Sequence, residues 1–93
     1  MSEELEARIR EILNNGTVRY NPHLKTRMAE RNYEMGDVLY ILRNDKVLKF
    51  KKQGNDKYHC EIHGEDLEGY RGAVVAIVIK AVRLDIVTVL GGV

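Results

Sequence analysis

The sequence predicts an α+β domain in which a helix pair packs on one face of an antiparallel sheet of four to five strands, with an extra N-terminal helix. The first half of the chain carries apolar residues at helical spacing. The second half consists of short segments rich in valine and isoleucine, separated by turn residues. All 93 residues fit one domain, spanning 1–93.

The N-terminal helix is predicted over residues 3–14. Leu5, Ile9 and Ile12 recur at helical spacing, and acidic residues in the first turn favour the helix dipole. The Asn-Asn-Gly sequence that follows ends the helix, because glycine readily adopts the conformation of a helix C-terminus. A short strand is then predicted over residues 17–20.

The predicted helix pair spans residues 22–31 and 35–43. Asn21 is the expected N-cap of the first of these helices. Pro22 takes its first position, where the missing N–H costs nothing and the fixed φ suits a helix. A tight turn, Asn-Tyr-Glu, joins the two helices and includes Asn32, which tolerates the left-handed conformation.

The remaining chain is predicted to form four strands. They span residues 46–52, 57–63, 73–80 and 84–90. Consecutive strands joined by short turns imply an antiparallel meander. The third of these strands is apolar at nearly every position, so we expect it to lie in the middle of the sheet.

Composition excludes several classes of protein. The formal net charge is +1, so contact with RNA or DNA requires a local basic patch. The chain has one cysteine, which excludes an internal disulfide and suits a reducing, cytoplasmic compartment. The longest apolar run, residues 73–79, is far shorter than the ~20 residues that a membrane helix requires. We therefore expect no membrane segment.

One side of the helix at 22–31 carries most of the residues that could take part in catalysis or phosphate binding. His23, Arg27, Glu30 and Arg31 lie at i, i+4, i+7 and i+8 and share one side of a helix. A histidine transfers protons near neutral pH, and an arginine fork holds a phosphate. The same spacing also fits an ordinary polar helix face with an Arg27–Glu30 ion pair. The sequence leaves both interpretations open.

The strand at 57–63 carries two histidines. Alternation places Tyr58 with the apolar core and His59 and His63 on the opposite face. These histidines lie ~13 Å apart along a strand, which is too far to bind one metal ion together. We expect no metal site, because Cys60 also points away from both histidines. His59 faces either a groove or solvent.

A basic run precedes this strand. Lys49 and Lys51 share one face of the strand at 46–52. Such lysines follow a phosphate backbone in some proteins and protect an exposed sheet edge in others. Both interpretations remain open.

Several segments together resemble a known family. The stretch from His23 to Arg31 reads H-x-x-x-R-M-x-E-R, and a run of valines and isoleucines later ends in Val-Thr-Val. Further matching residues are Asp37, Val38, Leu42, Tyr58 and Thr88. The chain resembles the small bacterial domain-of-unknown-function family four-two-five-eight over about residues 18–90, so the helix at 3–14 lies outside the family core.

That family is similar in element order to RelE/MqsR-like toxins. The resemblance implies a RelE-like fold, metal-independent cleavage of messenger RNA without a cofactor, and an antitoxin protein as partner. The catalytic residues it implies, with a second histidine added as a proton carrier, are His23, Arg27, Glu30, Tyr58 and His59. The RNA-binding residues expected beside them are Arg31, Lys49 and Lys51. The turn at 32–34 departs from the Gly-Ile-Ser that is usual in the family.

Two functions are therefore expected from the sequence. The first is a bacterial toxin–antitoxin endoribonuclease, in which His23 and Arg27 converge with a third polar group in a basic groove. The alternative is a non-catalytic protein-interaction module, or an inactive remnant of the toxin fold. Such a module predicts an exposed apolar patch or an open strand edge.

Overall fold

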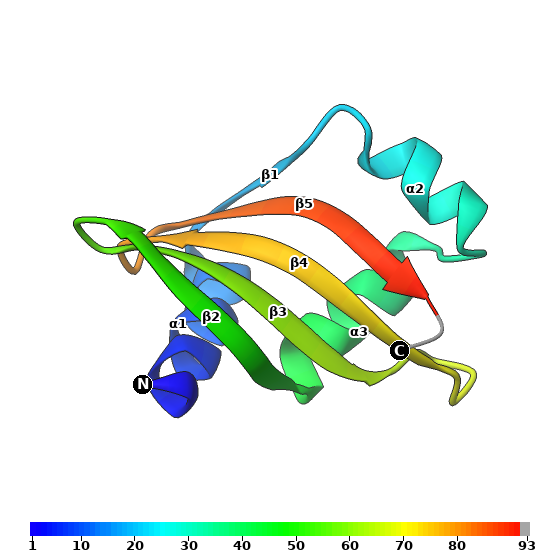
Figure 1. Ribbon diagram of the computed structural model, residues 1–93, viewed down its shortest axis with the longest axis horizontal. Helices are drawn as coiled ribbons and strands as arrows, with labels where there is room; N and C mark the ends of the chain where they lie inside the picture. Colours follow the sequence, from blue (N-terminus) through cyan, green and yellow to red (C-terminus); the bar gives the residue numbers. More distant parts are fainter. Residues whose placement is uncertain (92–93) are drawn as a thin grey trace.

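The computed structural model describes residues 1–91 as an α+β fold with three helices and a five-stranded sheet (Figure 1). In chain order the elements are α1 (Ser2–Asn15), β1 (Thr17–Tyr20), α2 (Leu24–Glu30), α3 (Met35–Asn44), β2 (Lys46–Gly54), β3 (Lys57–Glu65), β4 (Arg71–Ile79) and β5 (Arg83–Gly91). The sequence predicted every one of these elements, with shifts of one or two residues at most ends.

The sheet is mixed, with strand order β1-β5-β4-β3-β2. Strands β2 to β5 form the predicted antiparallel meander. The prediction of an entirely antiparallel sheet was wrong, because β1 pairs with β5 in parallel. The connection between β1 and β5 contains two helices and three strands, and so long a crossover readily returns the chain in the same direction.

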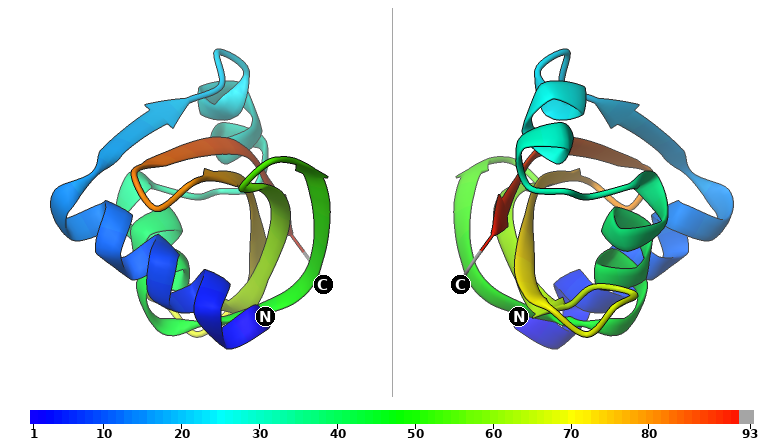
Figure 2. Two further views of the ribbon diagram at one scale, coloured as in Figure 1. Left: turned by 90° about the vertical axis from the view of Figure 1, so that its left-hand side faces the viewer. Right: turned by 90° about the vertical axis from the view of Figure 1, so that its right-hand side faces the viewer.

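Helices α1 and α3 cover one face of the curved sheet, called here the core face (Figure 2). They contact each other and the strands beneath them. Leu5, Ile9 and Ile12 of α1 are at most 1% exposed. The N-terminal helix is therefore half of the packed helix pair, whereas the sequence analysis treated it as an addition to a pair made of α2 and α3.

Helix α2 instead lies along the border of the sheet beside β5. Strand β1 pairs only with Arg83–Ile86 of β5, and the backbone N–H of Asn21 makes the last bond of this edge, to Ile86 O at 2.9 Å. The rest of β5 has no strand on that side, and α2 lies there. Leu24 and Met28 are the buried residues of α2.

The α2 helix begins at Leu24, two residues later than predicted. Asn21 Oδ1 accepts a hydrogen bond from the backbone N–H of His23 at 2.9 Å, and Asn21 O accepts one from Leu24 N at 2.9 Å. This turn, formed by an Asn side chain with its own local backbone, occupies the position expected for the first helical residues. At the other end Asn32 has φ 61°, the left-handed conformation expected for the turn.

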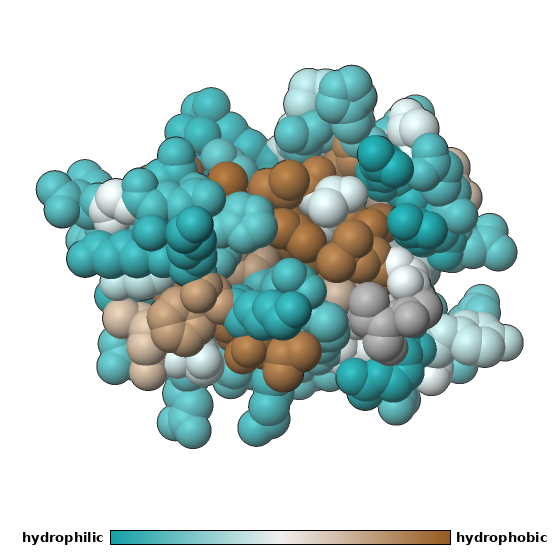
Figure 3. All heavy atoms as spheres, viewed as in Figure 1, coloured by the Kyte–Doolittle hydropathy of each residue, from teal (hydrophilic) through white to brown (hydrophobic). Residues whose placement is uncertain are grey.

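The opposite face of the sheet, called here the outer face, is open over much of its area (Figure 3). Apolar residues gather near its middle, and hydrophilic residues border them. Strand register assigns Val75 and Ile77 of β4 to this face, opposite Glu61 and His59 of β3. Within residues 1–91, no helix is both long and apolar enough to cross a membrane.

Candidate functional site

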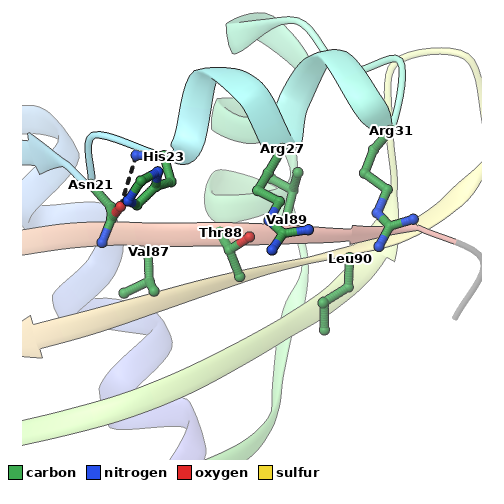
Figure 4. Close-up of a pocket in the computed structure, with 8 residues that line it drawn as sticks. All are labelled: Asn21, His23, Arg27, Arg31, Val87, Thr88, Val89 and Leu90. Carbon is green, nitrogen blue, oxygen red and sulfur yellow. Dashed lines mark hydrogen bonds between the residues drawn. The ribbon is translucent and has the colours of Figure 1, made fainter.

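A groove of about 400 Å³ runs between α2 and β5, and we call it the α2–β5 groove (Figure 4). One wall comes from α2 and the turn before it, and the floor comes from the second half of β5. The lining residues are Asn21, His23, Arg27, Arg31, Val87, Thr88, Val89 and Leu90.

Helical spacing explains why three basic or titratable side chains share this groove. His23 precedes the first residue of α2, Arg27 lies four residues on, and Arg31 follows the last helical residue. Leu24 and Met28 occupy the other side of the helix and are buried. The predicted arrangement, an apolar side on the core and His23 and Arg27 on the free side, is confirmed.

The Arg27 and His23 side chains in the groove form few hydrogen bonds or ion pairs with other residues. Arg27 Nη1 lies 3.2 Å from Glu30 Oε2, and these side chains are 53% and 49% exposed. Such an exposed ion pair contributes little to stability, so Arg27 is free to turn toward a ligand. The imidazole of His23 makes no hydrogen bond to any residue in 1–91. The bond between His23 and Asn21 comes from the backbone N–H of His23 and does not involve the ring.

Arg31 extends toward the end of β5 (Figure 4). A methyl group placed on Gly91 would lie only 3.1 Å from Arg31 Cδ. The absence of a side chain at Gly91 therefore gives the arginine room to cross the strand. Among residues 1–91 no carboxylate lines this groove, so His23, Arg27 and Arg31 make it a site suited to an anion.

The floor of the groove contains an irregularity in β5. Thr88 pairs with Val75 and Ile86 pairs with Ala76, so Val87 is an extra residue on its strand. Such bulges bend a strand and redirect side chains, and they are common next to functional sites. Here the bulge lies directly below His23 and Arg27 in the groove lining.

A second basic area lies across the outer face, on β2 and β3. Lys49 is paired with Glu61, and Lys51 is paired with His59, so the four side chains share this face. Together with Phe50 they line a shallow depression of about 190 Å³. Two strand spacings, about 10 Å, separate β3 from β5, and the apolar middle of the outer face fills that interval.

Strand β2 is also an edge strand, as one interpretation of its lysines required. Its pairing with β3 is irregular at two places, between Val47 and Lys49 and between Lys52 and Gly54. Irregular pairing and lysines both discourage a further strand from adding to an edge. Edge protection and contact with a phosphate backbone are therefore compatible at this strand.

The structure does not bring three of the predicted catalytic residues, Glu30, Tyr58 and His59, into the lining of the α2–β5 groove. Tyr58 is 8% exposed on the core face, where its ring packs edge-on against Phe50 at 6.4 Å and under Arg8 at 6.0 Å. Strand alternation directs Tyr58 away from the outer face, so the structure places it apart from His23 and Arg27, and its catalytic role stays a prediction from the resemblance. Glu30 reaches the site only through its contact with Arg27.

Sequence reasoning missed Asn21 as a lining residue and the stretch from Val87 to Leu90 as the floor. Asn21 was expected only as a helix cap. The Val-Thr-Val sequence was noticed as a strand end, but pairing beside α2 depends on contacts between distant segments. Its threonine was the one available signal, since Thr88 is the polar residue in the otherwise apolar run 86–90.

Cys60 is no candidate nucleophile. It is fully buried on the core face, and this burial raises the pKa of its thiol to about 11. A thiol acts as a nucleophile in its ionised form, which burial disfavours. Among residues 1–91, no three His, Cys, Asp or Glu side chains gather closely enough to hold a metal ion.

Comparison of the chain with protein-family models, curated proteins and solved structures finds no match. The resemblance to family four-two-five-eight and to RelE-like toxins stays a prediction from the sequence. The function is therefore argued from the groove itself.

Proposed function

We propose that this protein binds single-stranded RNA on its outer face and cleaves the phosphodiester that lies in the α2–β5 groove. The observation that carries the proposal is the convergence of His23, Arg27 and Arg31 in one open groove that no carboxylate of the described part of the chain lines. Arginine forks hold phosphate through paired charge-assisted hydrogen bonds. Histidine supplies a group that both accepts and donates a proton.

The proposed reaction uses the 2′-hydroxyl of the RNA as nucleophile. His23 takes the hydroxyl proton as the 2′-oxygen forms a bond to phosphorus. Arg27 and Arg31 neutralise the charge that develops on the phosphoryl oxygens. The bond from phosphorus to the 5′-oxygen then breaks, and that oxygen takes the proton from the His23 imidazolium. The products are a 2′,3′-cyclic phosphate and a 5′-hydroxyl.

The proposed reaction is metal-independent because of the side chains available. Mg²⁺ in phosphoryl-transfer sites is bound through carboxylates, and the α2–β5 groove offers imidazole and guanidinium groups instead. The cations of this groove would also repel a metal ion. The two arginines, Arg27 and Arg31, neutralise the charge that develops on the phosphoryl oxygens in place of a metal ion.

The proposed RNA path continues across the outer face to Lys49, Lys51 and His59. The apolar middle of this face suits the base and ribose surfaces of a flexible single strand, and the lysines attract its backbone. His59 was expected as a second proton carrier. Its place across the sheet, beside the lysines, supports a role in RNA contact instead. An antitoxin partner would inhibit cleavage by covering this path.

The test is incubation of the purified protein with total cellular RNA, with and without a chelator. Wild-type protein is expected to cleave in both conditions and to leave 2′,3′-cyclic phosphate ends. The His23→Ala, Arg27→Ala double variant is expected to lose cleavage while keeping its circular dichroism spectrum. Lys25→Ala is the matched control, because Lys25 is an exposed cation of α2 that lines a different surface.

Cleavage that disappears with the chelator, or that persists in the double variant, would contradict the proposed mechanism. Failure of the wild-type protein to bind or cleave RNA would contradict the proposed function. That result would favour the alternative, a non-catalytic interaction module.

One observation favours this alternative. A second groove, of about 340 Å³, lies on the other side of α2 and is almost entirely apolar. Tyr20, Pro22 and Met35 contribute to it, and the Tyr20 side chain is half exposed. An exposed apolar surface of this kind is typical of contact with another protein. A Tyr20→Glu substitution is expected to abolish partner binding under this alternative and to leave RNA cleavage unchanged under the first.

A further inference from the structure

A second pocket adjoins the α2–β5 groove at Arg31. It measures about 360 Å³ and lies between the turn that follows α2 and the loop that joins β3 to β4. We call it the loop pocket. Arg31 lines both hollows, and the residues at the end of β5 pass from one to the other, with Leu90 in the groove and Gly91 in the pocket. A ligand on Arg31 therefore has access to both.

The loop that forms one wall is held in place by its own hydrogen bonds. Asp66 Oδ1 accepts from the backbone N–H groups of Glu68 at 2.9 Å and Tyr70 at 3.0 Å. Asp37 Oδ1 accepts from Leu67 N at 3.1 Å and so ties the loop to α3. A wall that is already ordered costs little entropy when a ligand binds.

These bonds leave particular side chains for a ligand. Tyr70 lines the pocket and is 68% exposed, although its backbone is fixed. Glu68 lines the pocket and is exposed, and its carboxylate bonds to no residue in 1–91. The pocket thus offers an aromatic ring and a free acceptor next to the arginine that it shares with the groove.

The charges of the loop pocket select the kind of group that enters it. Three carboxylates, those of Glu34, Asp66 and Glu68, line it against two arginines, Arg31 and Arg71, so its lining does not favour a second phosphate. A nucleobase carries no charge and presents flat faces and N–H donors. Single-stranded bases are recognised by stacking on aromatic rings and by hydrogen bonds to their edges.

We propose that the loop pocket takes the nucleobase that neighbours the phosphate on Arg31, and that it prefers a base with an exocyclic amino group over uracil. This inference rests on the proposed function. Tyr70 stacks on the base, and Glu68 accepts a hydrogen bond from the amino group, as carboxylates do for cytosine N4.

The test measures binding of fluorescent octamers of 2′-O-methyl adenosine, cytidine and uridine, which lack the nucleophile and stay intact. Wild-type protein is expected to bind the adenosine and cytidine octamers about fivefold or more tightly than the uridine octamer. Tyr70→Ala is expected to weaken binding by about fivefold to 100-fold, the range for loss of one stacked base. Tyr70→Phe keeps the ring and is expected to keep the affinity.

Two further variants isolate the cause. Tyr40→Ala removes an exposed tyrosine of α3 that does not line the loop pocket, and it is expected to leave binding unchanged. Glu68→Gln supplies both a donor and an acceptor, so it is expected to remove the preference against uridine. A merely repulsive Glu68 would instead give equal gains for all three octamers.

The outcomes separate this inference from the proposed function. If wild-type protein binds none of the octamers, both are overturned. If wild-type protein binds and Arg31→Ala weakens binding while Tyr70→Ala does not, only the loop pocket is overturned. Equal affinity of wild-type protein for the three octamers overturns the preference for an amino group.

Discussion

The two faces of the sheet are built from the same strands and differ in nearly every physical property. On the core face Tyr58, Cys60 and Ile62 of β3 are buried under α1 and α3. On the outer face the alternate residues of the same strand, among them His59 and Glu61, border open surface. Strand alternation alone produces this contrast.

The contrast teaches where stability and binding capacity lie. The core face places apolar side chains out of water, which is the main favourable term in folding. Beside this open face, on α2, Arg27 is half exposed and pairs only with the half-exposed Glu30. A cation in such an exposed pair adds little to the fold and remains available to an anionic ligand.

The largest expected effect is the loss of stability caused by a substitution on the core face. Ile9→Ala removes a side chain that is 1% exposed and is expected to lower the free energy of unfolding by about 2–5 kcal/mol. Ile77→Ala, on the outer face and only partly buried, is expected to cost less than half as much. Urea denaturation of both variants measures the difference. Equal losses would show that the outer face is covered in solution.

The next effect concerns the thiol of the core face. Burial raises the pKa of the Cys60 thiol to about 11, from the ordinary value of 9.0. At pH 8 its thiolate is therefore about 100-fold rarer than for an ordinary thiol, with one pKa unit equal to a factor of ten. Reaction with a disulfide reagent is expected to be at least that much slower in folded than in urea-unfolded protein. Comparable rates would indicate frequent opening of the core.

A smaller expected effect, on RNA binding, tests whether the outer face is the RNA-binding surface. Lys51 and Lys52 are neighbours on β2, paired with His59 and Tyr58, so they point to opposite faces. Lys51→Gln is expected to weaken RNA binding and to reduce its logarithmic salt dependence by about 0.7, as expected for one lost phosphate contact on a single strand. Lys52→Gln is the control and is expected to change neither quantity. Identical behaviour would mean that the edge, rather than the outer face, attracts RNA.

The smallest expected effect is a change of stability caused by a substitution at Tyr33 in the core. The hydroxyl of Tyr33 is buried, has no hydrogen-bond partner among residues 1–91 and packs against Gly72. An unpaired buried hydroxyl opposes folding, so Tyr33→Phe is expected to leave stability unchanged or raise it by about 1 kcal/mol. Thermal denaturation measures the change. A clear loss of stability would show that the hydroxyl bonds to an ordered water molecule.

Local patterns predicted the elements and part of the site. The alternation of β3 gave its buried residues, because a half-buried strand has a period of two. The spacing of His23, Arg27 and Arg31 gave one wall of the α2–β5 groove, because residues four apart share a helix face. Tyr58 was assigned to catalysis from resemblance alone, against its own alternation, and the structure places it on the core face, outside the lining of the groove.

These local patterns could not predict which distant segments pair with each other. The β1 strand has four residues, of which only Val18 is partly buried, so nothing in it specifies a parallel partner. The apolar stripe of α1 did signal burial, but the resemblance began after it and the helix was treated as an addition. The loop pocket was missed because Tyr70 lies in an aperiodic loop, and its position beside Arg31 in the fold leaves no mark in the local sequence.

The parallel pairing of β1 with β5 also bears on how the chain is made. Within residues 1–91 the only strand bonded to β1 is β5, which is synthesised last among the strands. A nascent chain therefore leaves β1 without its strand partner until Arg83–Ile86 emerges from the ribosome. Contacts that join such distant segments slow folding, because the loop between them must close first. The sheet completes the edge formed by β1 only after β5 has been synthesised.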